Sequence, residues 1–363
     1  MKTNAREEEL IHPDIGQAHT LPSRFYTDPA FLARENERIF ARTWQVVGRS
    51  EQVAKPGDYF TANVAGEALL LARDSAGELR GFHNVCRHRA GPPAEGCGNR
   101  KLFRCGYHGW AYSLEGKLLN APEFEGVADF RKEEFGLRPV QAAEWGGFLF
   151  VNLDDRAEPL EDALGELPRQ VEKFHFERLR LYRRHDYVME CDWKAYIDNY
   201  LEGYHLPSVH PGLNRELDYG SYQTTLFPRH SLQASPIRGA EKDKGAPRHY
   251  QAGEGELSAE YFWIFPNWML NCYPDNMSLN VVLPVGPGKC VAIFEWYFPE
   301  EALKTGGPEQ TVKFSDEIQQ EDGHICEVVY RNLQSRHYDR GRYSVKQEKG
   351  VHHFHRLYAE RMA

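Results

Sequence analysis

Cys86-Arg87-His88 and, after sixteen intervening residues, Cys105-Gly106-Tyr107-His108 form the most informative stretch of this sequence. Each of the two segments offers one thiol and one imidazole. Glycine and proline follow them, in Gly91-Pro92-Pro93 and at Gly109, and these residues favour tight loops in which backbone amides can approach a bound group. The stretch therefore predicts two matched loops that share one metal centre.

Two kinds of metal centre use this set of donors. A structural zinc site can take two cysteines and two histidines in a tetrahedron. Zinc motifs, however, keep Cys with Cys and His with His, whereas each segment here is mixed. In a Rieske-type [2Fe-2S] cluster one iron takes both thiolates and the other takes both imidazoles. We therefore predict such a cluster on Cys86, His88, Cys105 and His108.

The length and charge of the chain limit the classes of protein to which it can belong. Its 363 residues leave room for two domains. A net charge of -9 without runs of Lys or Arg gives no electrostatic footprint for nucleic acid or for an anionic membrane. The charged N-terminus lacks the apolar core of a secretory signal, and no stretch approaches the roughly twenty apolar residues of a membrane span. We expect a cytoplasmic protein without nucleic-acid or membrane partners.

The seven cysteines do not form a disulfide framework, because their number is odd and they are spread over a long chain. Three histidines near the C-terminus, His352, His353 and His355, lie in a charged terminal helix. We expect them to be packing or solvated residues rather than a further metal site. The cysteines outside the cluster loops are expected to be buried free thiols: Cys97, Cys191, Cys272, Cys290 and Cys326.

Hydrophobic patterning predicts an α+β protein in three successive parts. Residues 1–44 form an arm and a helix that docks on a neighbouring domain. Residues 45–155 contain short strands with turn signals, carry both cluster loops, and form a β domain. Residues 156–363 combine helical patterns with aromatic-rich strands between 261 and 298, which predicts an antiparallel sheet flanked by helices. The helical patterns of this last part cover 159–176, 192–205, 310–332 and 345–362.

A second group of candidate ligands lies at the end of the helical stretch 192–205. Asp198, Glu202 and His205 fall on one face of that helix, and His210 follows on the next turn. Two histidines and one carboxylate, with open positions, form the facial set that holds non-haem Fe(II) for O2 activation. Taken alone, two histidines at this spacing are more often structural. Beside an electron-storing cluster they predict an iron site, because the two centres form one working unit.

The carboxylate of this iron site must come from elsewhere in the chain. Glu202 precedes His205 by one helical turn and is better placed to hold a neighbouring imidazole. Asp322 is the best candidate, since it stands in an amphipathic helical segment of the third part. Glu321 is the second choice. We predict His205, His210 and Asp322 as the ligands.

Further segments match one known family. The chain resembles the Rieske non-haem iron oxygenases over nearly its whole length, specifically their large (alpha) oxygenase component. Within that family it is similar to choline monooxygenase and other quaternary-ammonium oxygenases. The segments that carry this similarity are Asp192-Trp193-Lys194, Asp198-Asn199-Tyr200-Leu201-Glu202-Gly203-Tyr204-His205, Phe265-Pro266-Asn267, Val282-Leu283-Pro284-Val285-Gly286-Pro287, and Gly341-Arg342-Tyr343 with His352-His353-Phe354-His355.

The resemblance implies a [2Fe-2S] cluster, a mononuclear Fe(II) and O2 as co-substrate. It implies a helix-grip, START-like fold for residues 156–363, and a homotrimer in which the cluster of one subunit feeds the iron of the next. Glu202 would bridge His108 of one subunit and His205 of its neighbour, and Asn199 would belong to the same catalytic motif. One oxygen atom would enter the substrate and the other would leave as water. Electrons would come from a separate NAD(P)H-dependent flavin or iron–sulfur reductase.

The expected substrate is a quaternary ammonium compound such as choline or a betaine, which would be hydroxylated or N-demethylated. The family branch has a Trp-Met-Asp-Thr-Asn run in its pocket strand, but this chain has Asn276-Met277-Ser278-Leu279-Asn280. A neutral or aromatic substrate is therefore the alternative, and a non-catalytic Rieske electron carrier is the alternative from another class. Aromatic rings and a carboxylate bind quaternary ammonium groups, so we predict a pocket from Tyr204, Phe262, Trp263, Trp268, Tyr273 and Glu295.

Overall fold

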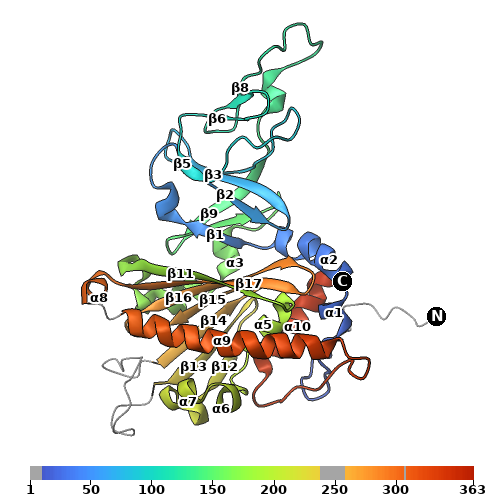
Figure 1. The fold of residues 1–363 in the computed structure, drawn as a ribbon, viewed down its shortest axis with the longest axis vertical. Coiled ribbons are helices and arrows are strands. Elements are labelled where there is room, and N and C mark those ends of the chain that lie inside the picture. The colour runs from blue at the N-terminus through green and yellow to red at the C-terminus, as the bar shows by residue number, and fades with distance from the viewer. Residues whose placement is uncertain (1–9, 238–257, 306–307) are drawn as a thin grey trace, which may run out of the picture. The chain divides into compact units, whose positions relative to one another are not determined.

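The computed structural model of the chain describes residues 10–237, 258–305 and 308–363 (Figure 1). It divides into two compact units. The larger unit comprises Met1–Glu35 and Leu164–Ala363, and the smaller unit comprises Asn36–Ala163. The predicted functional domains at 1–44, 45–155 and 156–363 stay a prediction, because these units are defined by packing alone. The first nine residues of the expected N-terminal arm lie outside the described residues.

The smaller unit is built from two antiparallel sheets. Its seven-stranded sheet has the order β1-β10-β9-β4-β3-β2-β5, and its three-stranded sheet has the order β6-β7-β8. A hairpin turn joins β3 and β4: the Asp74 carboxylate accepts hydrogen bonds from the amides of Ala76 and Glu78, and Gly77 has a φ of 85°. The strands are β1 (Gln45–Arg49), β2 (Asp58–Val64), β3 (Glu67–Arg73), β4 (Leu79–His83), β5 (Cys97–Asn99), β6 (Phe103–Arg104), β7 (Ala111–Tyr112), β8 (Leu118–Asn120), β9 (Pro139–Trp145) and β10 (Phe148–Asn152).

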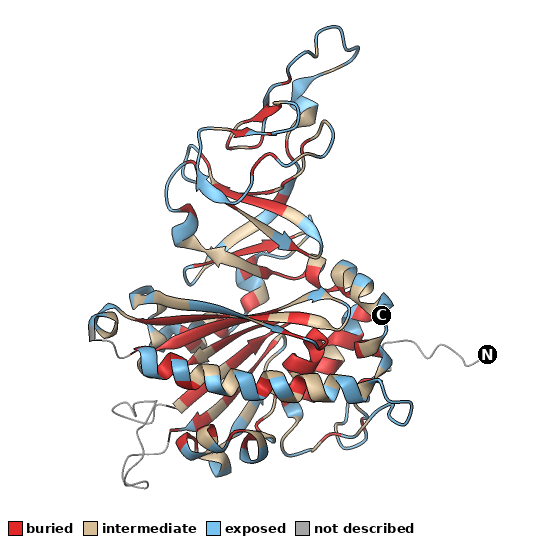
Figure 2. Ribbon diagram, in the orientation of Figure 1, coloured by how far each residue is buried: buried red, intermediate tan, exposed pale blue. Residues whose placement is uncertain are grey.

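The larger unit contains a second seven-stranded antiparallel sheet. Its order is β11-β17-β16-β15-β14-β13-β12, so most strands lie beside their neighbours in sequence. Burial is concentrated in the central strands, which Figure 2 shows in red. The strands are β11 (Leu179–Met189), β12 (Gln223–Leu226), β13 (His230–Pro236), β14 (Ser258–Ile264), β15 (Trp268–Cys272), β16 (Met277–Gly286) and β17 (Lys289–Pro299).

One long helix, α9, lies across this sheet (Figure 1), and α5 packs between α9 and the sheet strands. Because α9 is amphipathic, it buries one stripe that includes Phe314 and Asp322 and exposes the other. The α+β class and the antiparallel sheets predicted from the sequence are confirmed. The helices are α1 (Arg24–Thr27), α2 (Ala30–Arg38), α3 (Leu160–Leu164), α4 (Leu167–Val171), α5 (Trp193–Tyr200), α6 (Leu206–Val209), α7 (Pro211–Glu216), α8 (Glu300–Thr305), α9 (Pro308–Leu333) and α10 (Lys349–Met362).

A buried ionic cluster joins α2, α5 and α10. The Lys194 ammonium lies 2.6 Å from Glu35 and 2.7 Å from Asp192, and its side chain is 1% exposed. Glu35 also accepts hydrogen bonds from the Trp193 indole (2.8 Å) and the Tyr358 hydroxyl (2.6 Å). The Asp192 carboxylate caps α5 by accepting the Lys194 amide at 3.0 Å. The Asp-Trp-Lys segment thus fixes the start of the helix that leads to the candidate iron ligands.

The two ends of the described chain are bound to each other within the larger unit. The Arg342 side chain donates to the Ala18 carbonyl at 2.9 Å, and the His352 ring bonds the His12 carbonyl at 2.8 Å. His352 and His355 are buried, as the packing interpretation of the terminal histidines expects. His353 is half-buried, and its ring lies 6.3 Å from that of Trp263. The C-terminal helix is therefore an integral part of the unit.

The His355 imidazole sits in a network of buried hydrogen bonds against α5. Its Nε2 lies 2.8 Å from the Asp198 carboxylate and 3.0 Å from the Tyr26 hydroxyl, and its Nδ1 lies 2.6 Å from the Tyr343 hydroxyl. Tyr26 also donates to Asp198 at 2.6 Å. Segments from both ends of the chain thus bind the same carboxylate on α5.

Two predicted helices differ from the structure. The helix expected at 192–205 ends at Tyr200, because the Glu202 carboxylate takes the amides of Tyr204 and His205 away from the helical pattern. The helix expected at 159–176 is split into α3 and α4 at Gly165, whose φ is 57°. The candidate iron ligand His205, predicted at the end of the helix at 192–205, therefore lies in a turn.

Cys97 is exposed on β5, so the prediction that it is a buried thiol is wrong, whereas Cys191, Cys272, Cys290 and Cys326 are buried. An edge strand leaves one side open to solvent, and the sequence does not show that β5 is an edge.

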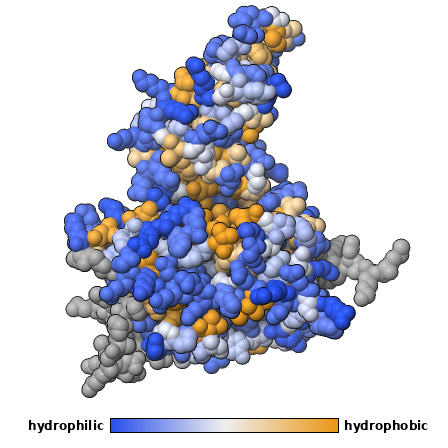
Figure 3. All heavy atoms as spheres, in the orientation of Figure 1, coloured by the Kyte–Doolittle hydropathy of each residue, from blue (hydrophilic) through white to orange (hydrophobic). Residues whose placement is uncertain are grey.

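The side chains visible in Figure 3 are mostly hydrophilic, in keeping with the net charge of -9. None of the helices within the described residues is long and apolar enough to cross a membrane.

Candidate active site and cluster site

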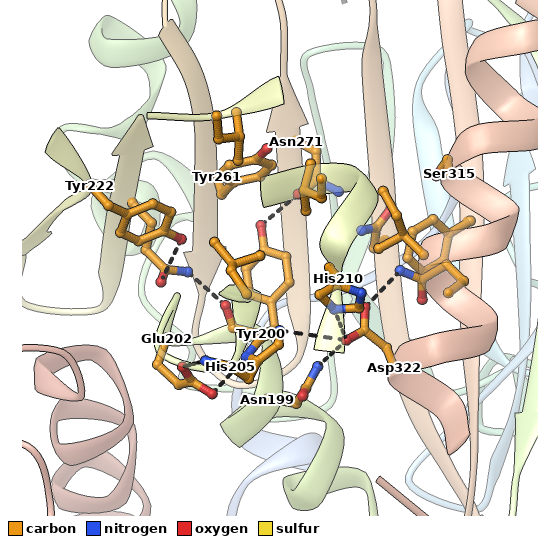
Figure 4. Close-up of a pocket in the computed structure, with 18 of the residues that line it drawn as sticks. Asn199, Tyr200, Glu202, His205, His210, Tyr222, Tyr261, Asn271, Ser315 and Asp322 are labelled. Atoms are coloured by element: carbon orange, nitrogen blue, oxygen red, sulfur yellow. Dashed lines mark hydrogen bonds and ion pairs between the residues drawn. The ribbon is translucent and has the colours of Figure 1, made fainter. Parts of the chain in front are cut away.

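Three predicted ligands come together in the larger unit. His205 lies in the turn before α6, His210 lies between α6 and α7, and Asp322 lies on α9. The Asp322 Oδ1 atom is 2.9 Å from His210 Nε2 and 3.7 Å from His205 Nε2. One ligand atom from each residue falls within 4.8 Å of the others, and Figure 4 shows the three side chains converging. The set is the two-histidine, one-carboxylate arrangement that non-haem iron prefers.

A second carboxylate holds the outer nitrogen of each histidine. Glu202 Oε1 lies 2.7 Å from His205 Nδ1, and Glu321 Oε2 lies 2.7 Å from His210 Nδ1. Such bonds place the proton on Nδ1 and turn the Nε2 lone pair toward the metal position. Asn199 donates to Asp322 Oδ1 at 2.6 Å. The residues present therefore fit a mononuclear iron, and the geometry favours Asp322 over Glu321 as the third ligand.

A cavity opens beside these three residues. Its walls come from α5, α9 and the sheet, and it carries five aromatic rings. Burial raises the pKa of Tyr261 to about 12 and also raises the pKa of Tyr200 and Tyr222, so these phenols are neutral near pH 7. Tyr200 donates to Asn271 at 2.7 Å, which fixes its ring. The five rings are those of Tyr200, Tyr222, Tyr261, Tyr273 and Phe294.

Of the six residues predicted for the substrate pocket, the structure places Tyr273 in the wall of this cavity. Tyr204 is 56% exposed, and Phe262, Trp263 and Trp268 are buried outside the wall. Glu295 also lies outside it and accepts a hydrogen bond from Tyr297. These five residues lie away from the space next to the candidate iron ligands.

Most of the cavity wall could not be predicted from the sequence, because successive residues of a strand face opposite sides. Tyr261 pairs with Asn271, and Asn280 pairs with Phe294, so these four share the face that lines the cavity. Phe262 follows Tyr261 and therefore points to the opposite face. The alternation of side chains along each strand was the available signal in the sequence, but it does not reveal which face of the sheet α9 covers.

The predicted cluster loops in the smaller unit have the same backbone pattern. The Cys86 amide donates to the Gly91 carbonyl and the Cys105 amide donates to the Trp110 carbonyl, both at 2.9 Å. Each cysteine carbonyl also accepts the amide four residues later, at 3.0 Å. Ala90 and Gly109 occupy these positions with φ values of 61° and 74°. The loops are thus matched, as the spacing of Cys and His predicts.

The four predicted donors meet between these loops. Cys86 and Cys105 are buried, and the His88 and His108 ring centroids lie 4.6 Å apart. The buried Nδ1 of His88 has no hydrogen-bond partner among the described residues, which leaves a ring nitrogen available to a metal. Burial, together with His108, lowers the pKa of His88 and favours the neutral imidazole that binds metals. These residues fit a [2Fe-2S] cluster.

The glycine at position 91 leaves room for this centre. A Cβ atom there would lie 2.8 Å from Cys105 Sγ, whereas a Cβ atom at Gly106 would meet nothing within 4 Å. We expect Gly91→Ala to displace the thiolate ligand at a cost of about 1–3 kcal/mol and to lower the cluster content. Iron and acid-labile sulfide per chain, with the visible absorption spectrum, measure the effect. Gly106→Ala is the matched control, and equal cluster content in both variants would contradict the expectation.

Two known families match the chain in consecutive regions. Residues 43–131 match the Rieske [2Fe-2S] domain, and residues 176–363 match the ring hydroxylating alpha subunit (catalytic domain). The chloroplastic choline monooxygenase of Arabidopsis thaliana is 37% identical over 362 residues, which cover 94% of this chain and 83% of that protein. The carnitine monooxygenase oxygenase subunit of Escherichia coli (strain K12) is 33% identical over 357 residues, which cover 95% of this chain and 94% of that protein.

Solved structures agree with these matches. The quaternary ammonium Rieske monooxygenase CntA in complex with L-carnitine has a TM-score of 0.85 and 28% identity, and the comparison covers 100% of both chains. Naphthalene 1,2-dioxygenase from Rhodococcus sp. has a TM-score of 0.78 at 21% identity, with 94% of each chain covered, and shares the fold.

The predicted family and enzyme class are thereby confirmed. The protein is an oxidoreductase whose cofactors are a Rieske [2Fe-2S] cluster and a mononuclear non-haem iron, with O2 as co-substrate. Alpha subunits of this kind work with a reductase partner and act on a small molecule. The chain belongs to the Rieske non-haem iron oxygenases, as an alpha subunit of the branch that includes the choline and carnitine monooxygenases.

Proposed function

We propose that this chain is the oxygenase component of an enzyme that hydroxylates or N-demethylates a quaternary ammonium compound. The observation that carries the proposal is the cavity beside His205, His210 and Asp322, whose wall combines five aromatic rings with two carboxylates. Aromatic faces attract a quaternary ammonium group through cation–π interactions. The relatives named choline monooxygenase and carnitine monooxygenase support the same class of substrate.

We assign the cofactor ligands from the two sites. Cys86 and Cys105 would bind one iron of the cluster, and His88 and His108 would bind the other. The carboxylate ligand Asp322, with His205 and His210, would hold the mononuclear iron. Bound there, the iron supplies reductive activation of O2: with two electrons and two protons, one oxygen atom enters a C–H bond of the substrate and the other leaves as water.

The protein side chains position the substrate for this reaction. Tyr200 is fixed by Asn271, and the Tyr222 hydroxyl donates to Gln233 at 3.1 Å, so the aromatic wall is rigid on the sheet side. Gln233 in turn donates to the Tyr200 carbonyl at 2.7 Å. A rigid aromatic wall presents the same face of the substrate to the iron position in each turnover.

A second cavity, of about 320 Å³, supports the proposed path of electrons. Glu202 lines both this cavity and the one beside the iron ligands, and Asp198 and Glu348 line the second cavity with it. In the smaller unit His108 is exposed, and its neighbour Tyr107 is 58% exposed. We propose a homotrimer in which His108 of one subunit reaches Glu202 of the next, and in which an NAD(P)H-dependent flavin or iron–sulfur reductase supplies the electrons.

A substrate screen tests the proposed function. The cluster of the purified holoenzyme is first reduced with a chemical reductant, so that no reductase protein is present. O2 is then added together with choline, glycine betaine, carnitine or a simple aromatic compound. We expect a quaternary ammonium compound to speed reoxidation of the cluster and to yield an oxygenated or demethylated product by mass spectrometry. Products formed only from aromatic compounds would overturn the proposal. Two irons per chain, instead of three, would indicate an electron carrier.

A further inference from the structure

We propose that Asn280 binds a hydroxyl group of the substrate, and that the substrates of this enzyme are quaternary ammonium alcohols rather than betaines that carry a carboxylate. This inference rests on the proposed function, because it concerns the substrate class of the same cavity. It is carried by one buried amide and by the charges of the cavity wall.

Asn280 is the buried amide in question. It lies in the middle of β16, paired with Met269 on one side and with Phe294 on the other. The residue is 0% exposed and lines the cavity beside the iron ligands. Neither its Oδ1 nor its Nδ2 atom has a hydrogen-bond partner within the part of the chain that the structure describes.

The other side-chain amides of the cavity wall are already engaged. Asn271 accepts from Tyr200 and donates to Ser278 at 3.1 Å. Asn199 donates to Asp322, and Gln233 bonds both Tyr200 and Tyr222. Gln319 accepts from Tyr196 and donates to Asp322 at 3.5 Å. Among the described residues of the wall, Asn280 is thus the amide whose whole hydrogen-bonding capacity remains for a ligand.

An unsatisfied buried amide is costly, and this sets the chemistry of its partner. Each buried polar atom without a partner costs about 1–3 kcal/mol, and the large majority of buried side-chain polar atoms in proteins are hydrogen-bonded. An amide offers both donors and an acceptor, and a hydroxyl group can satisfy both because it donates and accepts. A carboxylate only accepts, so it would leave Asn280 Oδ1 unpaired, and a methyl group would satisfy neither atom.

The charges of the wall also disfavour a carboxylate. Glu202 and Asp322 line the cavity, and none of its described lining residues is Lys or Arg. Apart from the iron that Asp322 would help to bind, the described wall offers a carboxylate no cationic partner to replace its hydration, and the Glu202 carboxylate would repel it. The aromatic rings of the same wall favour the quaternary ammonium end of a substrate.

The test compares three ligands that share one trimethylammonium group, on the oxidised holoenzyme, where no turnover occurs. Ethyltrimethylammonium, choline and glycine betaine differ only in bearing a methyl, a hydroxymethyl or a carboxylate group at one end. We expect equilibrium binding, measured by calorimetry, to be about tenfold or more tighter for choline than for ethyltrimethylammonium, and glycine betaine to bind more weakly than choline.

Asn280→Leu removes both hydrogen-bonding atoms at nearly constant shape. We expect it to lower the affinity for choline to that for ethyltrimethylammonium, and to leave the affinity for ethyltrimethylammonium within about threefold of the original. Ser231→Ala is the matched control, because Ser231 on β13 is also a buried residue whose hydroxyl lacks a described partner, but it lies outside the cavity wall. It should leave the preference for choline unchanged.

The outcomes separate this inference from the proposed function. If choline and ethyltrimethylammonium bind the unmodified enzyme equally, or if glycine betaine binds best, the inference fails while the proposed function stands. If none of the three binds, the inference fails, and the substrate screen with carnitine and aromatic compounds decides the proposed function. Because this comparison needs no variant, it decides the matter even if Asn280→Leu does not fold. Unchanged cluster absorption and iron content show that the variant has folded.

Discussion

Replacing Glu202 by glutamine is expected to slow electron transfer from the reduced cluster by about a hundredfold or more, the usual range for the loss of an essential proton-carrying group, while both metal centres remain. Glutamine keeps the shape of Glu202 and can still bond His205 Nδ1, which lies 2.7 Å away. It cannot carry the negative charge or exchange the proton. The rate of cluster reoxidation by O2 and substrate in a single turnover, with iron content per chain, measures the effect.

Glu321→Gln is the matched control for this variant. Glu321 makes the same 2.7 Å bond to the other iron histidine, His210, but it is absent from the described walls of both cavities. If orientation of a histidine were all that Glu202 provided, both variants should lose a similar factor, about 10–100 in metal affinity or activity. The Asp322→Ala variant is the reference for the loss of an iron ligand, and we expect it to contain two irons per chain. Equal reoxidation rates in the two glutamine variants would remove the bridging role of Glu202.

Lys194→Met is expected to lower the free energy of unfolding by about 3–5 kcal/mol, because it leaves two buried carboxylates without their cation. Lys194 contacts both Glu35 and Asp192, and all three are buried. Burial raises the pKa of Asp192 to about 7 even with the lysine present. The acid thus binds protons more tightly in the folded state than in the unfolded state. The loss in the variant should be largest near pH 8 and shrink as the pH falls toward 5.

Urea unfolding of the holoenzyme at several pH values checks this result. Lys304→Met serves as the control, since Lys304 pairs with Glu300 at 3.1 Å on the exposed surface of α8, where an ion pair contributes little. A midpoint of Lys194→Met that matches the control at pH 8 would show that the buried ionic cluster does not stabilise the fold.

The metal-binding loops were the most predictable part of this protein. Cys86, His88, Cys105 and His108 were found because few other chemistries place thiols and imidazoles at this spacing. The loops that carry them are also short and local, so the sequence specifies their shape directly. The structure brings these four side chains to one place, as it does for the two histidines of the iron site.

The cavity wall was the least predictable part, because it depends on contacts between distant segments. Asn280 and Ser315 meet there only because α9 covers one particular face of the sheet. The periodicity of the sequence also could not predict that α5 ends at Tyr200. This end depends on the Glu202 carboxylate, which competes with the helix for backbone amides. Local patterns thus revealed which residues can do chemistry, and tertiary packing decided which of them face the substrate.

The binding of distant segments to α5 has a consequence for folding. Lys194 pairs with Glu35 on α2, while Tyr358 and His355 from α10 bind Glu35 and Asp198. Each of these contacts joins residues more than 150 positions apart in the sequence, so we expect the helix that leads to the iron histidines to form late in folding. The smaller unit is one continuous segment, so we expect the cluster loops to form without waiting for these contacts.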